Sequence, residues 1–287
     1  MTLATEMEWR GKILAKIVLS RLPVSYRVWR RVGIFRHGHM RSGDYAIDVL
    51  EQAAERAGLR DVRGLRLLEL GPGDSLFSAV LARAAGAAAS VHVDVGEFAD
   101  RDLEHYREFA RLLVERGYEP VSLSGTSTLE ELLERCHARY LTGGLESLRA
   151  LPSGSIDFSW SQSTIEHIRA SDLMATAREL RRVMAAGASA VHLIDLRDHL
   201  ADGLNHLRVS RRVWESNLMA KSGFYTNRVR FSALREIFER AGFRCDVVHA
   251  THWGALPTPR RSMVEEFRAL SERELRVRTF VVRLNPA

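Results

Sequence analysis

The stretch of sequence that most restricts the fold is residues 65–78, which read LRLLELGPGDSLFS. Four leucines between residues 65 and 70 form a short apolar run, which is typical of a strand buried on both faces. From Leu76 onward, apolar residues recur at helical spacing. Gly71, Pro72 and Gly73 separate the two patterns, and these residue types favour turns. The stretch therefore predicts a strand, a glycine turn and a helix in direct succession.

Strand and helix patterns then alternate along the chain to about residue 200. Strands are expected at 65–70, 90–94, 139–142, 155–162 and 190–196. Further helices are expected around 101–116, 128–138 and 173–188. After an irregular segment at 200–230, a helix is expected at 231–243, followed by closing strands at 244–250 and 276–284. This alternation is typical of an α/β fold, in which helices cover both faces of a largely parallel sheet.

The composition indicates a soluble globular protein. A chain of 287 residues with 46% hydrophobic content can bury a full core, and we expect one large domain with additions. The longest apolar stretch near the start, residues 13–19, contains Lys16 and is far shorter than the roughly 20 residues of a membrane span. No small-residue cleavage site follows it, so we expect a cytoplasmic location. Cys136 and Cys245 are expected to be buried thiols, because two cysteines make neither a disulfide framework nor a metal cluster.

The positive charge is concentrated near the start of the chain. The formal net charge is +6, and residues 9–41 contribute +9 with no acidic residue, which leaves −3 for the rest. This distribution disfavours a nucleic-acid-binding body. Helical spacing of apolar residues predicts that residues 1–60 form a basic helical extension. That extension either packs on the main domain or makes peripheral contact with an anionic membrane or a phosphate-bearing substrate. Residues 35–40, FRHGHM, are expected to act as a lid.

The residues around the glycine turn indicate a nucleoside ligand that carries positive charge. Ligands of open parallel sheets collect at the carboxyl ends of the strands, where Asp94 can accept both hydroxyls of a ribose. A dinucleotide site would have a third glycine, but Ser75 follows Asp74 at that place. Glu69 would repel a pyrophosphate, whereas it suits a ligand with an ammonium group. Because these residues succeed one another in order, the sequence predicts binding of a cationic nucleoside.

With these residues, the sequence resembles the class I S-adenosylmethionine-dependent methyltransferases. The matching motifs are LELGPGDS, VDVG, GGLESL, SGSIDFSWSQSTIEHI and ELRRVMAAGASAVHLID, which span roughly residues 60–200. Three further segments resemble bacterial methyltransferases of polysaccharide and natural-product sugar gene clusters. They are LPVSYRVWRRVGIFRHG, DLRDHL and GFYTNRVRFSALREIFERAGF. The resemblance implies a Rossmann-like, seven-stranded mixed sheet. It also implies a methyltransferase domain at 61–287, with the insert at 200–230 as a substrate cap.

The resemblance also implies a cofactor site for S-adenosylmethionine, with S-adenosylhomocysteine as the product. The residues near the methionine part would be Glu69, Gly71, Gly73, Asp74 and Ser75. Asp94 would hold the ribose. The adenine would be bordered by Gly144, Leu145 and Glu146, and the site would be closed by Ser161 and Gln162. For Glu146, a solvated acid at a helix start is an equally good interpretation.

Methyl transfer from a sulfonium needs mainly positioning of the acceptor, but an alcohol or phenol must also lose a proton. The candidate bases follow the fourth and fifth strands. His167 is one, although an acidic residue and His at this place also serve helix packing. Asp195 and His199 could form an oriented pair. The alternative for this pair is a hydrogen bond that anchors the loop.

Metal dependence is not expected. Some relatives have an acid three residues before the acid–His pair, and Ser163 stands there instead. Substrate selection is expected in the 200–230 insert, where aromatic, amide and guanidinium side chains suit a sugar ring or a phosphate. The candidate substrate-binding residues are His206, Arg208, Trp214, Tyr225, Asn227 and Arg228. The alternative for each is to anchor its own loop.

The sequence thus predicts methyl transfer to a hydroxyl of a small molecule. We expect a sugar or a sugar-bearing metabolite, nucleotide- or lipid-linked, as the acceptor. The alternatives are N-methylation of an amino sugar or other small amine, and non-catalytic binding of S-adenosylmethionine. The segment SWSQ at the end of the fourth strand contains neither the Asn-Pro-Pro-aromatic run nor the cysteine of nucleic-acid methyltransferases. The positive charge of the Arg-rich insert disfavours a polyamine substrate. The sequence leaves the oligomeric state open.

Overall fold

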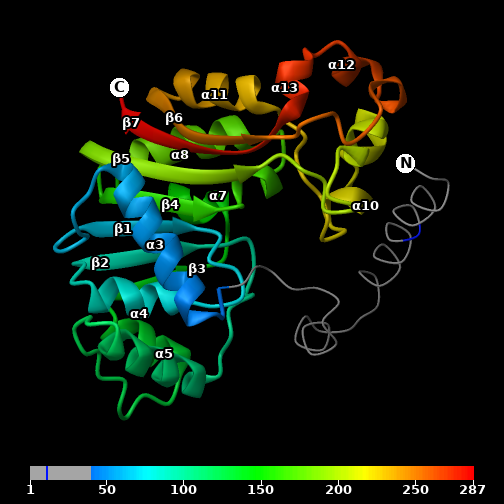
Figure 1. Cartoon of the computed structure of the whole chain (residues 1–287). Coiled ribbons are helices and arrows are strands. Elements are labelled where there is room, and N and C mark those ends of the chain that lie inside the picture. Colours follow the sequence, from blue (N-terminus) through cyan, green and yellow to red (C-terminus); the bar gives the residue numbers. More distant parts are fainter. Residues whose placement is uncertain (1–10, 12–39) are drawn as a thin grey trace.

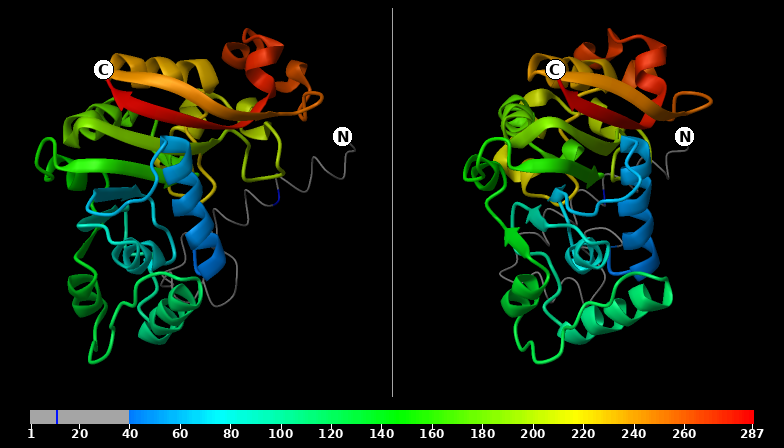
Figure 2. Two further views of the ribbon diagram at one scale, coloured as in Figure 1. Left: turned by 60° about the vertical axis from the view of Figure 1, so that its left-hand side comes forward. Right: turned by 90° about the vertical axis from the view of Figure 1, so that its left-hand side faces the viewer.

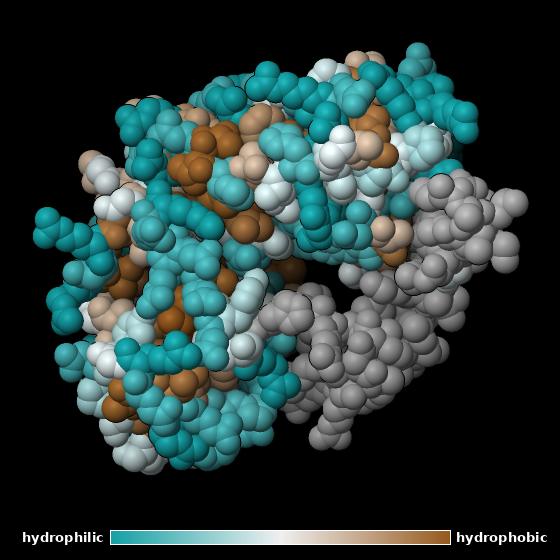
Figure 3. Space-filling view, in the orientation of Figure 1, coloured by the Kyte–Doolittle hydropathy of each residue, from teal (hydrophilic) through white to brown (hydrophobic). Residues whose placement is uncertain are grey.

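The computed structural model describes residue 11 and residues 40–287. Of the extension predicted at residues 1–60, residue 11 and residues 40–60 lie within this part, and the rest lies outside it. The lid predicted at residues 35–40 lies outside it apart from Met40. Within the described residues, no helix combines the length and the apolar character needed to cross a membrane. The face shown in Figure 3 is largely hydrophilic and carries small apolar patches, as is usual for a folded domain.

The centre of the fold is a seven-stranded sheet with the strand order β3-β2-β1-β4-β5-β7-β6 (Figure 1). The strands are β1 (Arg66–Leu70), β2 (Ala89–Val93), β3 (Ala138–Leu141), β4 (Ile156–Gln162), β5 (Met184–Asp195), β6 (Phe243–His252) and β7 (Val277–Pro286). The first five strands pair in parallel, whereas β7 runs antiparallel to both β5 and β6. The predicted Rossmann-like, seven-stranded mixed sheet is therefore confirmed.

Helices cover both faces of this sheet, as the two views in Figure 2 show. The longer helices are α3 (Gly43–Ala57), α4 (Phe77–Ala84), α5 (Leu103–Glu115), α6 (Leu129–Arg135), α8 (Leu173–Val183) and α11 (Phe231–Arg240). The shorter ones are α7 (Leu145–Arg149), α9 (Arg211–Trp214), α10 (Asn217–Ala220), α12 (Glu265–Arg268) and α13 (Glu272–Arg276). The apolar side chains of α3 to α6 form one core, and those of α7, α8 and α11 form the other.

Strand β1 contributes to both cores because its side chains alternate between the two faces. Leu67 lies in the core with α3 and α4, while Leu68 and Leu70 lie in the core with α7 and α8. Each is at most 4% exposed, and burying one leucine contributes about 1.5–3 kcal/mol. The four-leucine run was thus correctly interpreted as a strand buried on both faces. Both cysteines are buried free thiols, as expected.

The predicted boundary between α8 and β5 was wrong. The helix expected at 173–188 ends at Val183, and Met184 is already the first residue of β5. Met184 has a ψ of 133° and pairs with Ile156 of β4. The segment MAAGA has helical propensity, but pairing with a neighbouring strand overrides it, since propensity is a weak preference. The pairing of β5 with β7 uses residues 190–195, which were already predicted as strand.

A cap lies beyond the carboxyl ends of β5 and β6, and two separate segments build it. The first, residues 196–230, contains the 3₁₀ helix η2 (Asn205–Arg208), α9 and α10. The second, residues 253–276, contains the 3₁₀ helix η3 (Arg260–Ser262), α12 and α13. Leu207 of the first segment packs in one apolar cluster with Met263 and Phe267 of the second. The insert predicted at 200–230 is therefore only part of the cap.

Candidate functional site

The glycine turn follows β1 at the carboxyl edge of the sheet. Gly71 and Gly73 have φ angles of 71° and 72°, in the left-handed region that side chains with a Cβ disfavour. A Cβ on Gly71 would lie 2.3 Å from Oγ1 of Thr164, which follows β4. Thr164 Oγ1 also donates to the carbonyl of Leu70 at 3.1 Å. The turn is thus built for close approach of its backbone, and sequence reasoning missed the contribution of Thr164.

Asp94 is joined to this turn from the end of β2. Its Oδ2 accepts from the Gly73 N–H at 3.1 Å, and its Oδ1 accepts from the Val95 N–H at 2.7 Å. Burial raises the pKa of Asp94 to about 6, the two N–H bonds oppose the rise, and the charge of Glu69 adds to it. The structure therefore brings three predicted parts of the cofactor site together: the glycine turn, Glu69 and Asp94.

Glu69, two residues before the turn, is 2% exposed and belongs to a row of buried polar side chains. Its Oε2 accepts from the hydroxyl of Ser78 on α4, and Nδ1 of His92 on β2 is 2.8 Å away. Nε2 of His92 lies 2.9 Å from Oγ of Ser90. Side chains of the protein thus already hold Oε2 of Glu69. Contact between Glu69 and a cationic ligand stays a prediction.

The predicted adenine edge lies against Asp94. The Gly144 N–H donates to the Asp94 carbonyl at 2.8 Å, and a Cβ on Gly144 would come within 3.0 Å of the Val95 side chain. Val95 is 77% exposed, which is unusual for an apolar residue of this size. Sequence reasoning missed Val95. Leu145 begins α7, and Glu146 on its exposed surface pairs with Arg149 at 2.5 Å.

The other predicted cofactor residues make contacts within the protein. Ser75 is fully buried, and its Oγ accepts from the Phe77 N–H at the start of α4. Asp74 is 7% exposed, and its carbonyl accepts from the Asp100 N–H. Ser161 Oγ lies 2.8 Å from Nδ1 of the buried His192, whose pKa burial lowers to about 3. Gln162 donates to the hydroxyl of Tyr45 on α3 at 3.2 Å.

The three predicted catalytic residues lie near one another after β4 and β5. His167 ends the 3₁₀ helix η1 (Ile165–His167), and its Nδ1 lies 2.8 Å from the carbonyl of Tyr225. Since a carbonyl can only accept, Nδ1 carries the proton and Nε2 keeps its lone pair. The ring of His199 packs edge-on against His167, with centroids 4.9 Å apart. Desolvation by the surrounding protein atoms, and then the charge of His199, lower the pKa of His167 to about 4, although the residue is exposed at the surface.

Asp195 is held in a different way. Both of its carboxylate oxygens accept from the guanidinium of Arg197, at 2.6–3.0 Å. Burial acts to raise the pKa of Asp195, but the Arg197 bonds outweigh it and the net pKa is lowered. The Asp195 N–H donates to Oε1 of Glu166, whose pKa is raised well above its usual range by burial. Asp195 is thus an ion-pair partner of Arg197, and it lies close enough to influence His167 electrostatically.

Most of the predicted substrate-binding residues are buried in the cap. Trp214 is fully buried and donates to the Thr226 carbonyl at 2.7 Å. Arg228 donates to the Val209 carbonyl at 2.6 Å, and His206 is 1% exposed with its Nδ1 4.0 Å from Asp198. Because their polar atoms face protein groups, these side chains build the cap.

Two further members of that set connect the cap to the catalytic candidates. Asn227 donates to the carbonyls of Ile165 and Ile168, on either side of His167. Tyr225 supplies the carbonyl that orients His167, while its hydroxyl donates to Glu215 at 2.7 Å. Arg208 lies on η2 and is partly exposed. Tyr225 and Asn227 of the cap thus contact the segment that carries His167.

Metal ligands do not cluster in the part of the chain that the structure describes, where no three His, Cys, Asp or Glu residues are grouped to hold an ion. Ser163, which replaces the acid of metal-binding relatives, has a φ of 53° and donates its N–H to the Leu193 carbonyl.

Residues 68–192 match the family model described as a methyltransferase domain. This segment runs from β1 into β5, covers less than half of the chain, and contains the glycine turn, Asp94 and His167. In this segment the chain is therefore similar to methyltransferase domains.

Solved structures similar to this chain include several methyltransferases. An S-adenosylmethionine-dependent methyltransferase from Mesorhizobium loti shares 19% identity, with a TM-score of 0.46, and the match covers 82% of this chain and 99% of that one. A putative O-methyltransferase from Nostoc punctiforme shares 15% identity, with a TM-score of 0.46, over 98% of this chain and 68% of that one.

A phosphoethanolamine N-methyltransferase from Haemonchus contortus, solved with phosphomonomethylethanolamine and S-adenosylhomocysteine, shares 14% identity with a TM-score of 0.45. That match covers 88% of this chain and 55% of the other. No curated protein matches the sequence.

Proposed function

We propose that this protein transfers the methyl group of S-adenosylmethionine to a hydroxyl of a small molecule, with a sugar-bearing metabolite as the acceptor class. The observation that carries the proposal is the bond between Asp94 and the Gly73 N–H. It joins a carboxylate at the end of β2 to the glycine turn after β1, inside the matched methyltransferase domain. This is where an open parallel sheet binds a nucleoside.

The residues at this edge fit the donor. A Cβ at Gly71 would overlap Thr164 and one at Gly144 would crowd Val95, so the backbone at this edge requires glycine at both positions. Glu69 and Asp94 supply negative charge for a ligand with a sulfonium and an ammonium group. Asp94 would accept the ribose hydroxyls, and the exposed Val95 side chain would cover one face of the adenine. When bound, the donor supplies a methyl group that is already activated for transfer.

His167 is the general base in this proposal. The Tyr225 carbonyl holds its Nδ1–H, so Nε2 can accept the proton of an acceptor hydroxyl. Its lowered pKa keeps the ring neutral at physiological pH. The charge of Asp195 acts in the opposite direction and would stabilise the imidazolium that forms. Asp195 is a poorer base, because Arg197 holds both of its oxygens.

The cap orients the base. Tyr225 and Asn227 bond to the segment around His167, and the cap core around Trp214 holds them in place. We therefore assign the buried residues His206, Trp214 and Arg228 a supporting role, and we keep Arg208 as a candidate for direct acceptor contact. Precise orientation of acceptor and base contributes much of the rate of such a transfer.

Calorimetric titration with S-adenosylmethionine and S-adenosylhomocysteine tests the first step. We expect binding of both by the wild-type protein and loss of affinity in Asp94→Ala. Glu97→Ala is the matched control, because it removes a carboxylate three residues along the chain that is 75% exposed at its side chain. If the wild-type protein binds neither compound, the proposal is wrong.

A screen for labelled methyl transfer tests the second step. Nucleotide sugars, glycans and phenols are offered with the wild-type protein and with His167→Gln. We expect label on a hydroxyl oxygen of one acceptor class and little transfer by the variant. Label found on a nitrogen would show an amine acceptor instead, and cofactor binding without transfer to any acceptor would favour a non-catalytic binding protein.

A further inference from the structure

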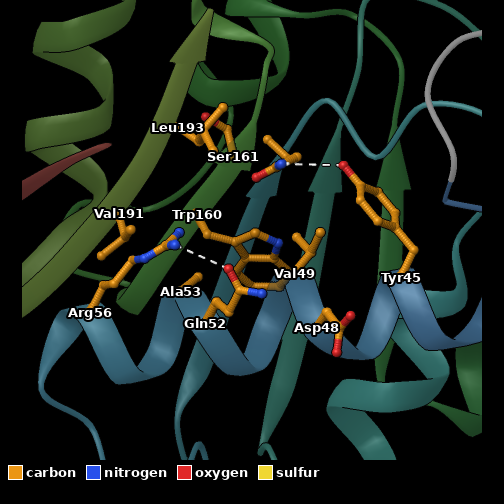
Figure 4. A pocket seen from close by; sticks show the side chains of 11 residues that line it. Tyr45, Asp48, Val49, Gln52, Ala53, Arg56, Trp160, Ser161, Val191 and Leu193 are labelled. Atoms are coloured by element: carbon orange, nitrogen blue, oxygen red, sulfur yellow. Dashed lines mark hydrogen bonds between the residues drawn. The ribbon is translucent and has the colours of Figure 1, made fainter. Parts of the chain in front are cut away.

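A separate hollow lies on the face of the sheet that α3 covers. Its volume is about 150 Å³, and it is bordered by α3 on one side and by β4 and β5 on the other (Figure 4). Neither the glycine turn nor Asp94 nor His167 lines it. It meets the proposed methyl-transfer site at the end of β4, where Gln162 borders it.

The inner surface of this α3 cavity is more apolar than polar, although Ser161 also lines it. Val49 and Ala53 line it from α3, and Trp160, Val191 and Leu193 line it from the two strands. An apolar cavity of about 150 Å³ is large enough to hold a benzene molecule. The α3 cavity therefore has room for a single six-membered ring.

The cavity also offers a hydrogen-bond donor that nothing uses. Trp160 is 1% exposed, and within the described part of the chain its Nε1 has no hydrogen-bond partner. A buried N–H without a partner is unfavourable, because it has lost its bonds to water. A ligand in the α3 cavity with an acceptor atom near this N–H would satisfy it.

The rim of the cavity disfavours a charged ligand. Asp48 and Arg56 border it with opposite charges, and Arg56 also donates to Gln52 at 3.0 Å. At the other end, Gln162 donates to the hydroxyl of Tyr45, as the dashed line in Figure 4 shows. A neutral ligand would gain most from an apolar interior with a rim of mixed charge, since it carries no charge that must be desolvated.

We propose that the α3 cavity is a binding site for one neutral, planar six-membered ring that carries a hydrogen-bond acceptor, with the ring against Val49, Ala53 and Val191 and the acceptor bonded to Trp160 Nε1. The cavity shares Ser161 and Gln162 with the predicted cofactor site, but its test uses phenol without S-adenosylmethionine. A failure of this proposal is therefore distinguishable from a failure of the proposed function.

Ligand-detected NMR titration of the full chain with phenol and with benzene tests the site. Phenol is expected to bind with a Kd of about 1 mM, which is typical for so small a ligand, and benzene more weakly. Trp160→Phe keeps an aromatic ring but removes the N–H, and should weaken phenol binding about five- to tenfold while changing benzene binding less than about twofold. Equal affinity for phenol and benzene in the wild-type protein would contradict the role of Trp160.

Two variants that fill the cavity locate the binding. Ala53→Leu fills it from the inside, and Gln52→Phe closes it from the exposed rim, where the risk of misfolding is smaller. Glu55→Leu adds an apolar side chain on an exposed part of the same helix and is the control. Loss of phenol binding in Gln52→Phe, and also in Ala53→Leu if that variant folds, with binding kept in Glu55→Leu, supports the proposal. Phenol binding that persists in Gln52→Phe, or no binding by the wild-type protein up to about 10 mM, would overturn it.

Discussion

The raised pKa of Asp94 predicts that cofactor affinity depends on pH. In the free protein this pKa is about 6, mainly because the carboxylate is buried. A carboxylate can accept both ribose hydroxyls, whereas the protonated acid keeps less acceptor capacity. Binding therefore requires the ionised form. Below pH 6 the affinity should fall, and each bound ligand should release up to one proton from Asp94.

The size of the effect follows from the fraction of ionised Asp94. With a pKa of about 6, Asp94 is about 90% ionised at pH 7 and about 10% ionised at pH 5, so the Kd should rise about tenfold between them. Both S-adenosylmethionine and S-adenosylhomocysteine carry the ribose, so both should show the same factor. Calorimetry at the two pH values, in two buffers of different ionisation enthalpy, measures affinity and proton release together.

The raised pKa of Asp94 also predicts how the free energy of unfolding depends on pH. A carboxyl whose folded pKa is raised favours folding below its unfolded pKa, and this contribution is lost as the pH rises through the folded value. A rise from 3.8 to about 6 means that ionised Asp94 costs about 3 kcal/mol above pH 6. Asp94→Asn removes this cost but loses one acceptor for the N–H of Gly73 or Val95, worth about 1 kcal/mol.

The Asn variant should therefore be about 1–2 kcal/mol more stable than the wild type at pH 7 in urea unfolding, while its affinity for both ligands becomes weaker and independent of pH. Equal wild-type affinities at pH 5 and pH 7 would refute the reasoning. A pH effect on S-adenosylmethionine alone would also refute it, because it would point to the sulfonium charge and not to the ribose.

Three further outcomes are expected. His167→Gln should lower kcat about 10²–10³-fold and leave the Kd for S-adenosylmethionine within about twofold, measured by labelled transfer and calorimetry; an unchanged kcat would exclude the base role. Gly71→Ala should destabilise the protein by about 1–3 kcal/mol in urea unfolding, and Thr164→Ala in the same chain should restore part of this loss by removing the atoms that the new Cβ would meet. His92→Leu should cost about 1–3 kcal/mol at pH 7, because Glu69 loses a buried partner; a variant as stable as the wild type would show that the row of buried polar side chains contributes little.

Much of the proposed cofactor site could be predicted from the sequence, because its signals are local. Gly71 and Gly73 follow directly after a strand, and Asp94 directly follows the next one. Parallel strands place their carboxyl ends at one edge, so such residues meet in space. The contact partners were not predictable in the same way. Thr164 and Val95 have no distinctive local pattern, and their roles depend on the sheet that brings them to Gly71 and Gly144.

The cap shows the opposite case. Its aromatic and basic residues were interpreted as a substrate surface from their chemistry alone. In the structure, Trp214 and Arg228 lie in its interior, because the second segment at 253–276 and the residues around Thr226 supply their partners. A residue type does not reveal which way its side chain faces when a distant segment packs over it.

The sequence by itself determined the order of strands and helices, the glycine turn and the acid at the end of β2, because periodicity and turn chemistry act over a few neighbouring residues. Only the tertiary structure decided that Met184 leaves the helix to pair with Ile156, that His92 and Ser78 hold Glu69, and that α3 leaves a cavity over Trp160. Each of these depends on contacts between residues far apart in the chain, whose energies no local pattern records.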